Sequence, residues 1–442
     1  MNFKKLRTQL ESQLRELLPA DLSYRVFLNS EASTFIRLNK GKVRQPGSVH
    51  QAHATLDISK GKRHFKSHIS LSGVPEQDLA RLKDLLVPEA EMLSLLDPDP
   101  HIMEMPEPQT SEFFGPRSQV EPQEVLREIL EASNGLDLVG IYAAGRIARS
   151  YFDSAGSNMH HETDRSHFDF SVFAHHDKAV KCSVSGEHWE EAQLAETLGR
   201  AKQQLPYLHH ESKTIEPGRY RAYLAPSAVG SVLSLLSWSA FSEKSHQTGL
   251  SPLKSLRSGE RLLHKSITIS ESPGSLQGPR FNETGFMTPE TVSLIEKGRY
   301  RSSLVSPRSG NEFDIPHNGA NLSESPNYLS MVPGKLPEAS ILEALGTGVF
   351  ISDLWYLNFS DPQICRMTGM TRFASFWVEN GKIVAPLCVM RFDDSIFNLF
   401  GSRLEGLTSR SEIFHEAHTY NSRNTSAMQV PGALVDGLTF TL

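Results

Sequence analysis

The chain has 442 residues, more than one compact core usually holds, so we expect two or three structural units. Hydrophobic residues make up 38% and charged residues 22% of the sequence, a balance that excludes a mainly disordered chain. The formal net charge of −6 is spread without basic tracts, which argues against a nucleic-acid-binding protein.

The first 95 residues predict an α-β-meander-α unit. Apolar residues between Phe3 and Leu17 recur three and four apart among charges, as in an amphipathic helix and unlike a signal peptide. A second helix is predicted from Pro75 to Leu86. Between the two helices, short alternating stretches separated by turn residues predict four strands, at 24–28, 34–38, 51–58 and 63–70.

The remaining chain predicts a linker and two further domains. Residues 96–122 are rich in proline and acidic side chains, which favours a linker. Residues 123–216 read as a central α+β domain, with strands at 138–144, 148–152, 167–175 and 179–184 and a helix at 187–205. Residues 217–442 predict a mainly antiparallel β domain, in which Asn380-Gly381 marks a tight hairpin. The expected fold class is therefore α+β.

The cysteines and the hydropathy indicate the compartment. Cys182, Cys365 and Cys388 are odd in number and fit no zinc-binding spacing, so free thiols in a reducing compartment are expected. No apolar stretch approaches the ~18 residues that a membrane span needs. We therefore expect a cytoplasmic protein that does not bind a membrane.

Val229 to Lys244 is the most helix-like central segment. Five apolar side chains along it are available for packing: Val232, Leu235, Leu236, Trp238 and Phe241. It contains no histidine, and Glu243 is its only acid, so it holds neither a metal-ligand set nor a catalytic acid–base pair. A core helix without catalytic residues is the interpretation that follows.

Two histidine clusters invite a metal-site interpretation. His160, His161 and His167 lie close to Glu162 and Asp164, but no two of these ligands stand at helical spacing, and a solvated turn is the favoured interpretation. The second cluster, His415-Glu-Ala-His418, has its imidazoles three residues apart, whereas the zincin helix needs four. It predicts a surface helix end or a loop.

Other catalytic signatures are absent from the sequence. It contains no GxSxG elbow, phosphate-binding loop or dinucleotide-binding glycine motif that follows a strand. Cys182 lies in a predicted strand and favours a buried small side chain over a nucleophile. Asp393-Asp394 precedes a helix predicted at 395–404, and such a pair usually caps a helix. We therefore assign no catalytic residue and no metal ligand to this chain.

Four segments in a fixed order resemble one protein family. Residues 24–70 form a strand with an acidic residue followed by glycine-containing hairpins, and residues 217–262 form a strand–helix–loop that ends in Gly-Glu-Arg. Residues 267–306 carry Phe281, Glu283, Gly285 and Gly298, and residues 373–400 carry a Glu-Asn-Gly-Lys hairpin. Together these segments resemble the TldD/PmbA family of metallopeptidases over nearly the whole chain.

The departures from the family pattern concern its metal. The TldD branch carries HExxxH on its central helix and a late cysteine as a further ligand. Here the matching stretch 231–245 has no histidine, and residues 422–442 have no cysteine. Hydroxyl and aromatic side chains cannot replace imidazole or thiolate ligands. The chain therefore resembles the PmbA (TldE) branch, which lacks the metal motif.

The resemblance implies a role in peptide processing. It suggests a metal-free subunit of a peptidase that acts on peptides or unfolded segments, with zinc or another divalent metal held by a HExxxH-bearing TldD-like partner. The substrate-cleft candidates under this hypothesis are Ser237, Trp238, Phe241 and His246. Two alternatives stay open: a catalytically inactive peptide-binding homodimer, and an enzyme whose metal ligands have moved to the His160–His167 cluster.

Overall fold

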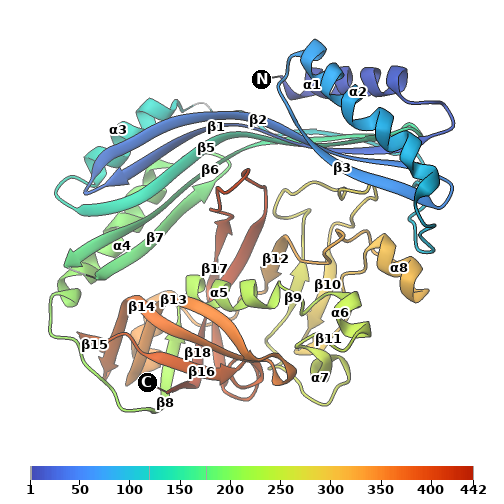
Figure 1. Cartoon of the computed structure of the whole chain (residues 1–442). Helices are drawn as coiled ribbons and strands as arrows, with labels where there is room; N and C mark the ends of the chain where they lie inside the picture. Colours follow the sequence, from blue (N-terminus) through green and yellow to red (C-terminus); the bar gives the residue numbers. More distant parts are fainter. Residues whose placement is uncertain (1, 119, 176, 442) are drawn as a thin grey trace.

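The structure is a computed structural model that describes residues 2–118, 120–175 and 177–441. A long N-terminal sheet arches over a C-terminal β domain, and helices cover the outer side of the arch (Figure 1). This mixed architecture confirms the predicted α+β class. No helix in the described part of the chain is long and apolar enough to cross a membrane.

The N-terminal layer is a seven-stranded sheet within the described residues. Its strands are β1 (Ser23–Asn39), β2 (Lys42–Lys60), β3 (Arg63–Leu71), β4 (Thr110–Phe114), β5 (Asp137–Asp153), β6 (Asn158–His175) and β7 (Lys178–Gly186). The order is β3-β2-β1-β5-β6, and β6 pairs with both β4 and β7 along its other edge. All pairings are antiparallel except that of β4 with β6.

Several strand predictions were too short. The stretch 51–58 covers only part of β2, and 167–175 covers only part of β6. The stretches 24–28 and 34–38 belong to one strand, β1, and 138–144 and 148–152 belong to one strand, β5. The residues between them do not form turns, because the strands continue through them and most of their polar side chains are buried on one face of the sheet or the other. Glu31, for example, is 1% exposed and accepts a hydrogen bond from the Ser33 hydroxyl at 2.8 Å.

Helices cover the outer face of this sheet in two groups. α1 (Phe3–Leu17), α2 (Pro75–Met92) and the short η1 (Leu93–Leu95) share a hydrophobic cluster with Val26 and Leu28 of β1. α3 (Pro122–Ala132) and α4 (Glu191–Leu208) share a second cluster with Ile36 and Leu38 of the same strand. These β1 residues are all even-numbered, as expected for one face of a strand. The predicted domains 1–95 and 123–216 therefore meet within one continuous sheet, and the 96–122 segment between them contributes β4.

The C-terminal layer is an eleven-stranded sheet within the described residues, and part of it closes into a barrel. The barrel strands are β8 (Gly218–Leu224), β13 (Gly348–Asp361), β14 (Arg366–Glu379), β16 (Arg391–Ser395) and β18 (Ala427–Phe440). β18 pairs with both β16 and β8, which closes the ring. Closure removes the exposed edges that an open sheet would have.

Shorter elements extend the barrel. The additional strands are β9 (Ile269–Glu271), β10 (Val292–Glu296), β11 (Arg299–Tyr300), β12 (Tyr328–Met331), β15 (Lys382–Pro386) and β17 (Leu404–His415). The small helices are α6 (Glu243–Gln247), α7 (Lys254–Arg257), α8 (Pro307–Phe313), α9 (Ile341–Leu345), η2 (Glu338–Ser340), η3 (Pro362–Ile364) and a π-helix, η4 (Asn398–Ser402). The helix predicted at 395–404 is found in shortened form: β16 extends to Ser395, and a short helical segment follows that ends with η4 at Ser402.

The central helix is shorter and begins earlier than predicted. α5 runs from Pro226 to Leu236, where the predicted helix ran from Val229 to Lys244. Proline at its first position fixes the backbone torsion that starts a helix. After Leu236 the chain turns, and Ser242 begins the separate helix α6 by accepting a hydrogen bond from the amide of Ser245 at 3.1 Å. α5 packs its apolar side against the barrel core.

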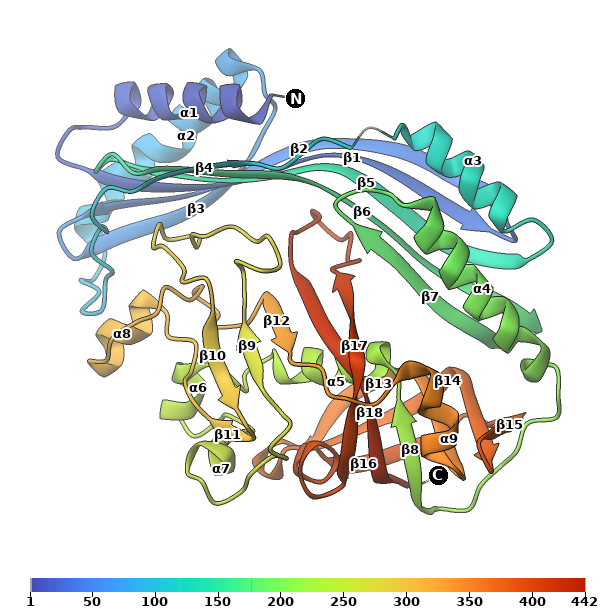
Figure 2. The same ribbon diagram turned by 180° about the vertical axis from the view of Figure 1, so that it is seen from behind.

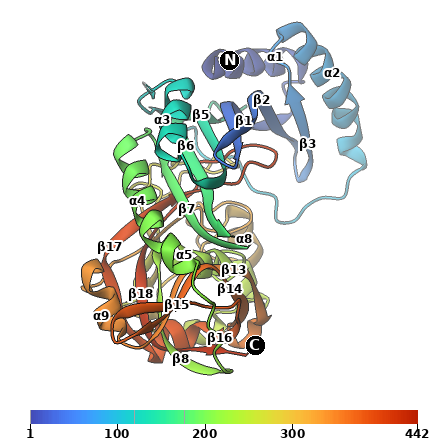
Figure 3. The ribbon, with the colours of Figure 1, turned by 90° about the vertical axis from the view of Figure 1, so that its left-hand side faces the viewer.

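The β17–β18 hairpin joins the two layers. Its loop rises to the inner face of the N-terminal sheet (Figure 2), and Figure 3 shows the same two layers from the side. At the loop, Arg423 donates hydrogen bonds to the Ser33 hydroxyl at 3.2 Å and to the carbonyl of Arg165 at 2.6 Å. Its own carbonyl accepts from Arg149 at 2.8 Å. The hairpin therefore fixes the spacing between the layers.

Candidate functional site

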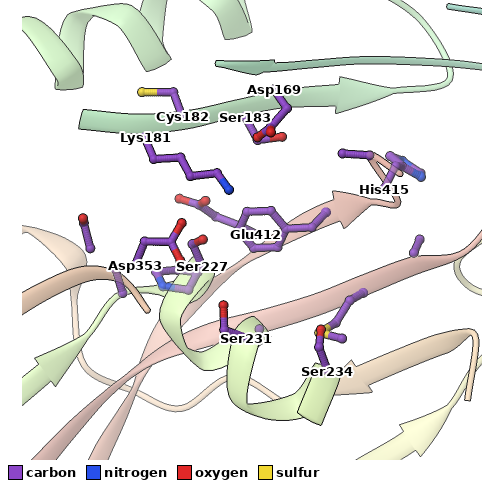
Figure 4. Close-up of a pocket in the computed structure, with 18 of the residues that line it drawn as sticks. Asp169, Lys181, Cys182, Ser183, Ser227, Ser231, Ser234, Asp353, Glu412 and His415 are labelled. Atoms are coloured by element: carbon purple, nitrogen blue, oxygen red, sulfur yellow. The ribbon is translucent and has the colours of Figure 1, made fainter. Parts of the chain in front are cut away.

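A cleft of about 840 Å³ opens between the two layers. Its walls come from β7 and α4 on the N-terminal side, and from α5, β13 and β17 on the C-terminal side (Figure 4). The volume falls in the range typical of ligand and substrate sites. Because both layers contribute, the cleft depends on the interface that the β17–β18 hairpin holds.

The helix α5 presents small hydroxyl-bearing residues to the cleft. Ser227, Ser231 and Ser234 line it at spacings of four and three residues, which place them on one helix face, and Gly230 lines it beside them. The opposite face of α5 is apolar and buried in the barrel core. The short side chains leave open space above the helix, so the cleft floor is a polar surface without imidazole or carboxylate groups.

Two aspartates and one lysine contribute charged groups to the cleft, besides Arg200, Glu338, Glu412 and Glu416. Asp353 ends the regular part of β13 beside Ser227, whereas Asp169 of β6 and Lys181 of β7 come from the sheet above (Figure 4). Burial raises the pKa of Asp353 and the pKa of Asp169, and the nearby ammonium of Lys181 opposes both shifts. Ser227 also hydrogen-bonds the Asp353 carboxylate, which favours its charged form.

A salt bridge spans the cleft between its two layers. Arg200 of α4 donates to the Glu412 carboxylate of β17 at 2.9 Å. The Arg200 side chain is 46% exposed and that of Glu412 is 26% exposed, so the pair contributes only modestly to stability. The position of this salt bridge is more informative than its energy, because it connects α4 of the N-terminal layer to β17 of the C-terminal layer across the cleft.

Cys182 lines the cleft but is not activated. Burial raises the pKa of its thiol to about 12, so the group stays protonated at neutral pH. A thiol nucleophile or metal ligand acts as the thiolate. The prediction of Cys182 as a small strand residue agrees with its position in β7.

The His160–His167 cluster is not the solvated turn that the sequence favoured. All three histidines lie within β6 and are at most 4% exposed. His160 pairs its ring nitrogens with the Ser150 hydroxyl at 2.8 Å and the Glu162 carboxylate at 3.1 Å. His160 and His161 also differ in strand parity, so their side chains point to opposite faces. The run of polar residues was interpreted as a turn because the sequence does not show that other parts of the chain cover these strand side chains.

His415 and His418 lie at the end of β17 and in the loop that follows. This agrees with the predicted loop and not with a zincin helix. His415 lines the cleft, where burial lowers its pKa to about 3, with nearby Arg165 adding to the shift. The imidazole is therefore neutral at physiological pH.

The four predicted cleft residues separate into two pairs. Ser237 and Trp238 line the cleft, and Trp238 exposes 60% of its surface. Phe241 is fully buried in the barrel core. His246 contacts the Tyr300 hydroxyl at 2.8 Å and lies away from the cleft lining. That Ser237 and Trp238 contact a substrate stays a prediction.

Residues 217–442 match the model of the PmbA/TldA metallopeptidase C-terminal domain. The chain belongs to this family. The matched region includes α5, the barrel and the β17–β18 hairpin, so the family domain supplies the lower half of the cleft. No curated protein matches the sequence significantly.

Solved structures share the fold of this PmbA/TldA family member over its whole length. TldE from Thermococcus kodakarensis superimposes with a TM-score of 0.81 at 14% identity, covering 98% of this chain and 100% of the other. A candidate modulator of DNA gyrase from Thermotoga maritima gives 0.77 at 14% identity, with both chains fully covered. A similar protein from Bacteroides thetaiotaomicron gives 0.73 at 15% identity, covering 99% and 98%.

The residues of this PmbA/TldA chain do not fit the metal that the TldD branch holds. The stretch 231–245, which resembles the metal-motif segment, begins inside α5, passes its end at Leu236 and continues into α6. It holds no histidine, and its one acid, Glu243, accepts hydrogen bonds from Arg257 through both carboxylate oxygens at 2.9 Å. The described residues also contain no group of three or more His, Cys, Asp or Glu side chains that could hold a metal ion.

Sequence reasoning missed most of the charged cleft residues. Asp169, Lys181 and Asp353 are separated by up to 184 residues, and no motif connects them. The one local signal was the polar residue Asp169 between the buried residues Phe168 and Phe170, which marks an inward-facing position of a strand. That Asp353 lines the same cleft as Asp169 became apparent only from the three-dimensional structure.

Proposed function

We propose that this chain is the metal-free subunit of a TldD/PmbA-type peptidase that acts on peptides or unfolded segments in the cytoplasm. The observation that carries the proposal is the stretch 231–245, which holds no histidine and whose one acid, Glu243, is bound by Arg257 at 2.9 Å. A HExxxH-bearing partner would hold the divalent metal, which supplies the Lewis acid and the activated water of peptide hydrolysis.

This chain would contribute a peptide-binding wall. Within the described residues β7 pairs only with β6, and its residues Val180 to Ser183 line the cleft. An extended peptide can add to such a strand through main-chain hydrogen bonds, which recognise backbone more than side chains. The exposed indole of Trp238 provides an apolar contact at the opposite wall.

Co-expression with a HExxxH-bearing family member from the same genome tests the proposal. We expect the two chains to co-purify, and an unstructured peptide to be cleaved by the mixture but not by either chain alone. Cleavage by this chain alone, abolished by a chelator, would overturn the proposal. A stable homodimer that binds peptide and ignores the partner would favour the inactive homodimer instead.

A cleft-filling variant tests whether this chain contacts the peptide. Ser231→Phe places a large ring over the cleft floor and should reduce cleavage by the mixture while the two subunits still associate. Ser258→Phe is the matched control, because Ser258 is exposed and outside the cleft. Equal cleavage by the two variants would show that this cleft holds no substrate.

A further inference from the structure

A second pocket, of about 460 Å³, lies between the inner face of the N-terminal sheet and the loops of the C-terminal layer. Its floor is built by strand register. His68, Thr55 and Phe27 lie side by side on β3, β2 and β1, and Asn29 of β1 lies beside Arg149 of β5. The walls come from residues 271–289, 318–328 and 424–426.

Arg149 is the cation of this pocket and lacks a counter-ion. The residue is 8% exposed and lines the pocket. Its guanidinium donates only to carbonyl oxygens, those of Ala148 at 3.0 Å and Arg423 at 2.8 Å. No carboxylate of the described residues lies within 4.0 Å of it. A buried charge without a charged partner is strongly destabilising, so its presence calls for an anion.

Other cations near Arg149 add to the need for an anion in this pocket. Arg423 and Arg165 are also buried, at 2% and 3% exposed, and only Arg165 forms an ion pair, with Glu187 at 2.6 Å. Lys66 at the pocket rim is exposed and has no ion pair among the described residues. The buried Glu31 acts on Arg149 and Arg423 from beyond ion-pair distance and favours their charged forms. Neither guanidinium has a carboxylate within 4.0 Å among the described residues.

The two acids of the pocket are already engaged by the protein. The carboxylate oxygens of Glu271 accept from the amides of Asn327 and Tyr328 at 2.9–3.0 Å. Glu283 accepts from the amide of Leu322 at 2.6 Å. Neither carboxylate approaches Arg149 to within 4.0 Å. These contacts leave the guanidinium as the group that a ligand can neutralise.

The rest of the pocket lining indicates what kind of chemical group the anion of the ligand is attached to. Neutral polar residues, mainly asparagine, serine and threonine, share the remaining wall with six apolar side chains: Phe27, Phe281, Val292, Leu304, Ala320 and Leu322. A fully hydrated ion such as phosphate gains little from such a surface, whereas an organic acid buries its apolar part there. We propose that this pocket binds a carboxylate attached to an apolar group, with Arg149 as the recognising cation.

Two sources can supply such a carboxylate: the C-terminus of a peptide, or a free small organic acid. Asn327, Asn424 and Ser426 line both the pocket and the main cleft, so the two spaces meet at the β18 end of the hairpin loop. A chain end lying in the cleft can therefore reach Arg149. The inference needs only this chain and does not depend on a partner subunit.

Calorimetric titration of the full chain with N-acetyl-leucine and with N-acetyl-leucinamide tests the inference directly. Because the two probes differ only in the carboxylate, the acid should bind at least about tenfold more tightly than the amide. Equal binding of both probes, or no binding of the acid at about 10 mM, would overturn the inference.

Variants locate the binding site. Arg149→Gln should weaken binding of N-acetyl-leucine at least about tenfold and leave the amide unchanged, whereas Arg149→Lys should retain part of the preference. Arg261→Gln removes one exposed positive charge outside the pocket and should have no effect. If Arg149→Gln does not fold, Lys66→Gln at the exposed rim should still give a measurable loss. Wild-type affinity in both pocket variants would overturn the assignment.

Competition by a short peptide that ends in leucine separates the two sources. Displacement of N-acetyl-leucine by the free-acid peptide but not by its amidated form would support a site for peptide C-termini. Failure of both peptides to displace it would support a site for free organic acids. Equal displacement by the two peptides would contradict recognition of the carboxylate.

Discussion

Glu271 shows how burial sets the charge of a single residue. Glu271 is half-buried at the end of β9, and burial of its carboxyl group raises its pKa from 4.5 to about 7, although two backbone amides favour the charged form. The folded chain therefore holds a proton on Glu271 between pH 4.5 and 7 that the unfolded chain releases. Stability from this group is present below pH 4.5 and is lost as the pH rises toward 7.

Glu271→Gln should remove this pH dependence. At pH 7.5 we expect the variant to be more stable than the wild type by up to about 3 kcal/mol, because the glutamine needs no deprotonation and its oxygen still accepts from the amides. Urea denaturation at pH 4.5 and 7.5 measures the difference. Glu290→Gln, an exposed control, should leave the pH profile unchanged. Parallel wild-type and variant profiles would contradict the shifted pKa.

The adjacent acids Asp393 and Asp394 differ in environment more than the sequence suggests. Both were expected to cap a helix, but they lie in β16 and their side chains point to opposite faces. Asp394 is 3% exposed and accepts from Arg403, Asn398 and the amide of Thr439 at 2.7–3.0 Å. Asp393 pairs with Arg366, whose side chain is 47% exposed.

Asp394→Ala should therefore destabilise the chain far more than Asp393→Ala. Removing Asp394 leaves the half-buried Arg403 without its carboxylate and is expected to reduce the free energy of unfolding by about 3–5 kcal/mol. The more solvent-exposed Asp393 pair should account for about 1 kcal/mol or less. Thermal or urea unfolding of the two variants compares them, and similar losses would contradict the different environments.

At the scale of elements, one loop depends on a glycine. Gly285 has φ +89°, and a Cβ added there would lie 2.2 Å from the ring of Tyr151 on β5. Tyr151 is fully buried against Phe281 and Met159, so its ring cannot move aside. The loop between β9 and β10 therefore packs on the N-terminal sheet only because this residue lacks a side chain.

Gly285→Ala should destabilise the protein by about 2–4 kcal/mol through this overlap. Gly156→Ala is the matched control, because Gly156 also has a positive φ of +108° but nothing lies within 4 Å of an added Cβ. The loss of unfolding free energy in Gly156→Ala reports backbone strain alone. The additional loss in Gly285→Ala reports the overlap with Tyr151. Chemical denaturation measures both, and equal losses would show that Tyr151 is free to move.

The sequence predicted elements well where a local pattern decides them, and less well where tertiary contacts do. The amphipathic helices α1 and α2 were recognised from their periodic apolar residues. β1 and β5 were divided in two because polar residues in β1, and Gly145 and Arg146 in β5, interrupt the apolar alternation; those side chains are covered only in the folded protein. The end of α5 at Leu236 was missed because the apolar residues Trp238 and Phe241 continue the helical spacing beyond it.

At the scale of the molecule, the two layers could not be assembled from sequence patterns. β4 joins the sheet by parallel pairing with β6 across some 50 residues, from a segment that composition marked as a linker. The cleft likewise combines Asp169 with Asp353 through contacts that only the barrel and the arch together create. The resemblance of four sequence segments indicated the family, whereas local patterns could not predict how the two layers pack against each other.

Neutral buried histidines at the interface between the layers should make the whole molecule acid-sensitive. Burial lowers the pKa of His161, His167 and His415 to about 3, and nearby Arg165, Arg149 and Arg423 contribute to these shifts. Each histidine has a ring nitrogen with no hydrogen-bond partner among the described residues. The unfolded chain binds protons here below pH 6.5 and the folded chain does not, so stability is present above pH 6.5 and is lost as the pH falls toward 3.

The interface should therefore weaken first on acidification. At pH 5 each histidine can remove up to about 2 kcal/mol of stability, and together they outweigh the opposite contribution of Glu271. We expect proteolysis of the loop at residues 416–426 to accelerate between pH 7.5 and 5, because opening the layers releases Arg423 from Ser33 and Arg165. His167→Gln with His415→Gln should reduce the acceleration, whereas His418→Gln, at an exposed position, should not. A rate of loop cleavage independent of pH, or equal effects of buried and exposed substitutions, would show that protonation of these histidines does not control the contact between the two layers.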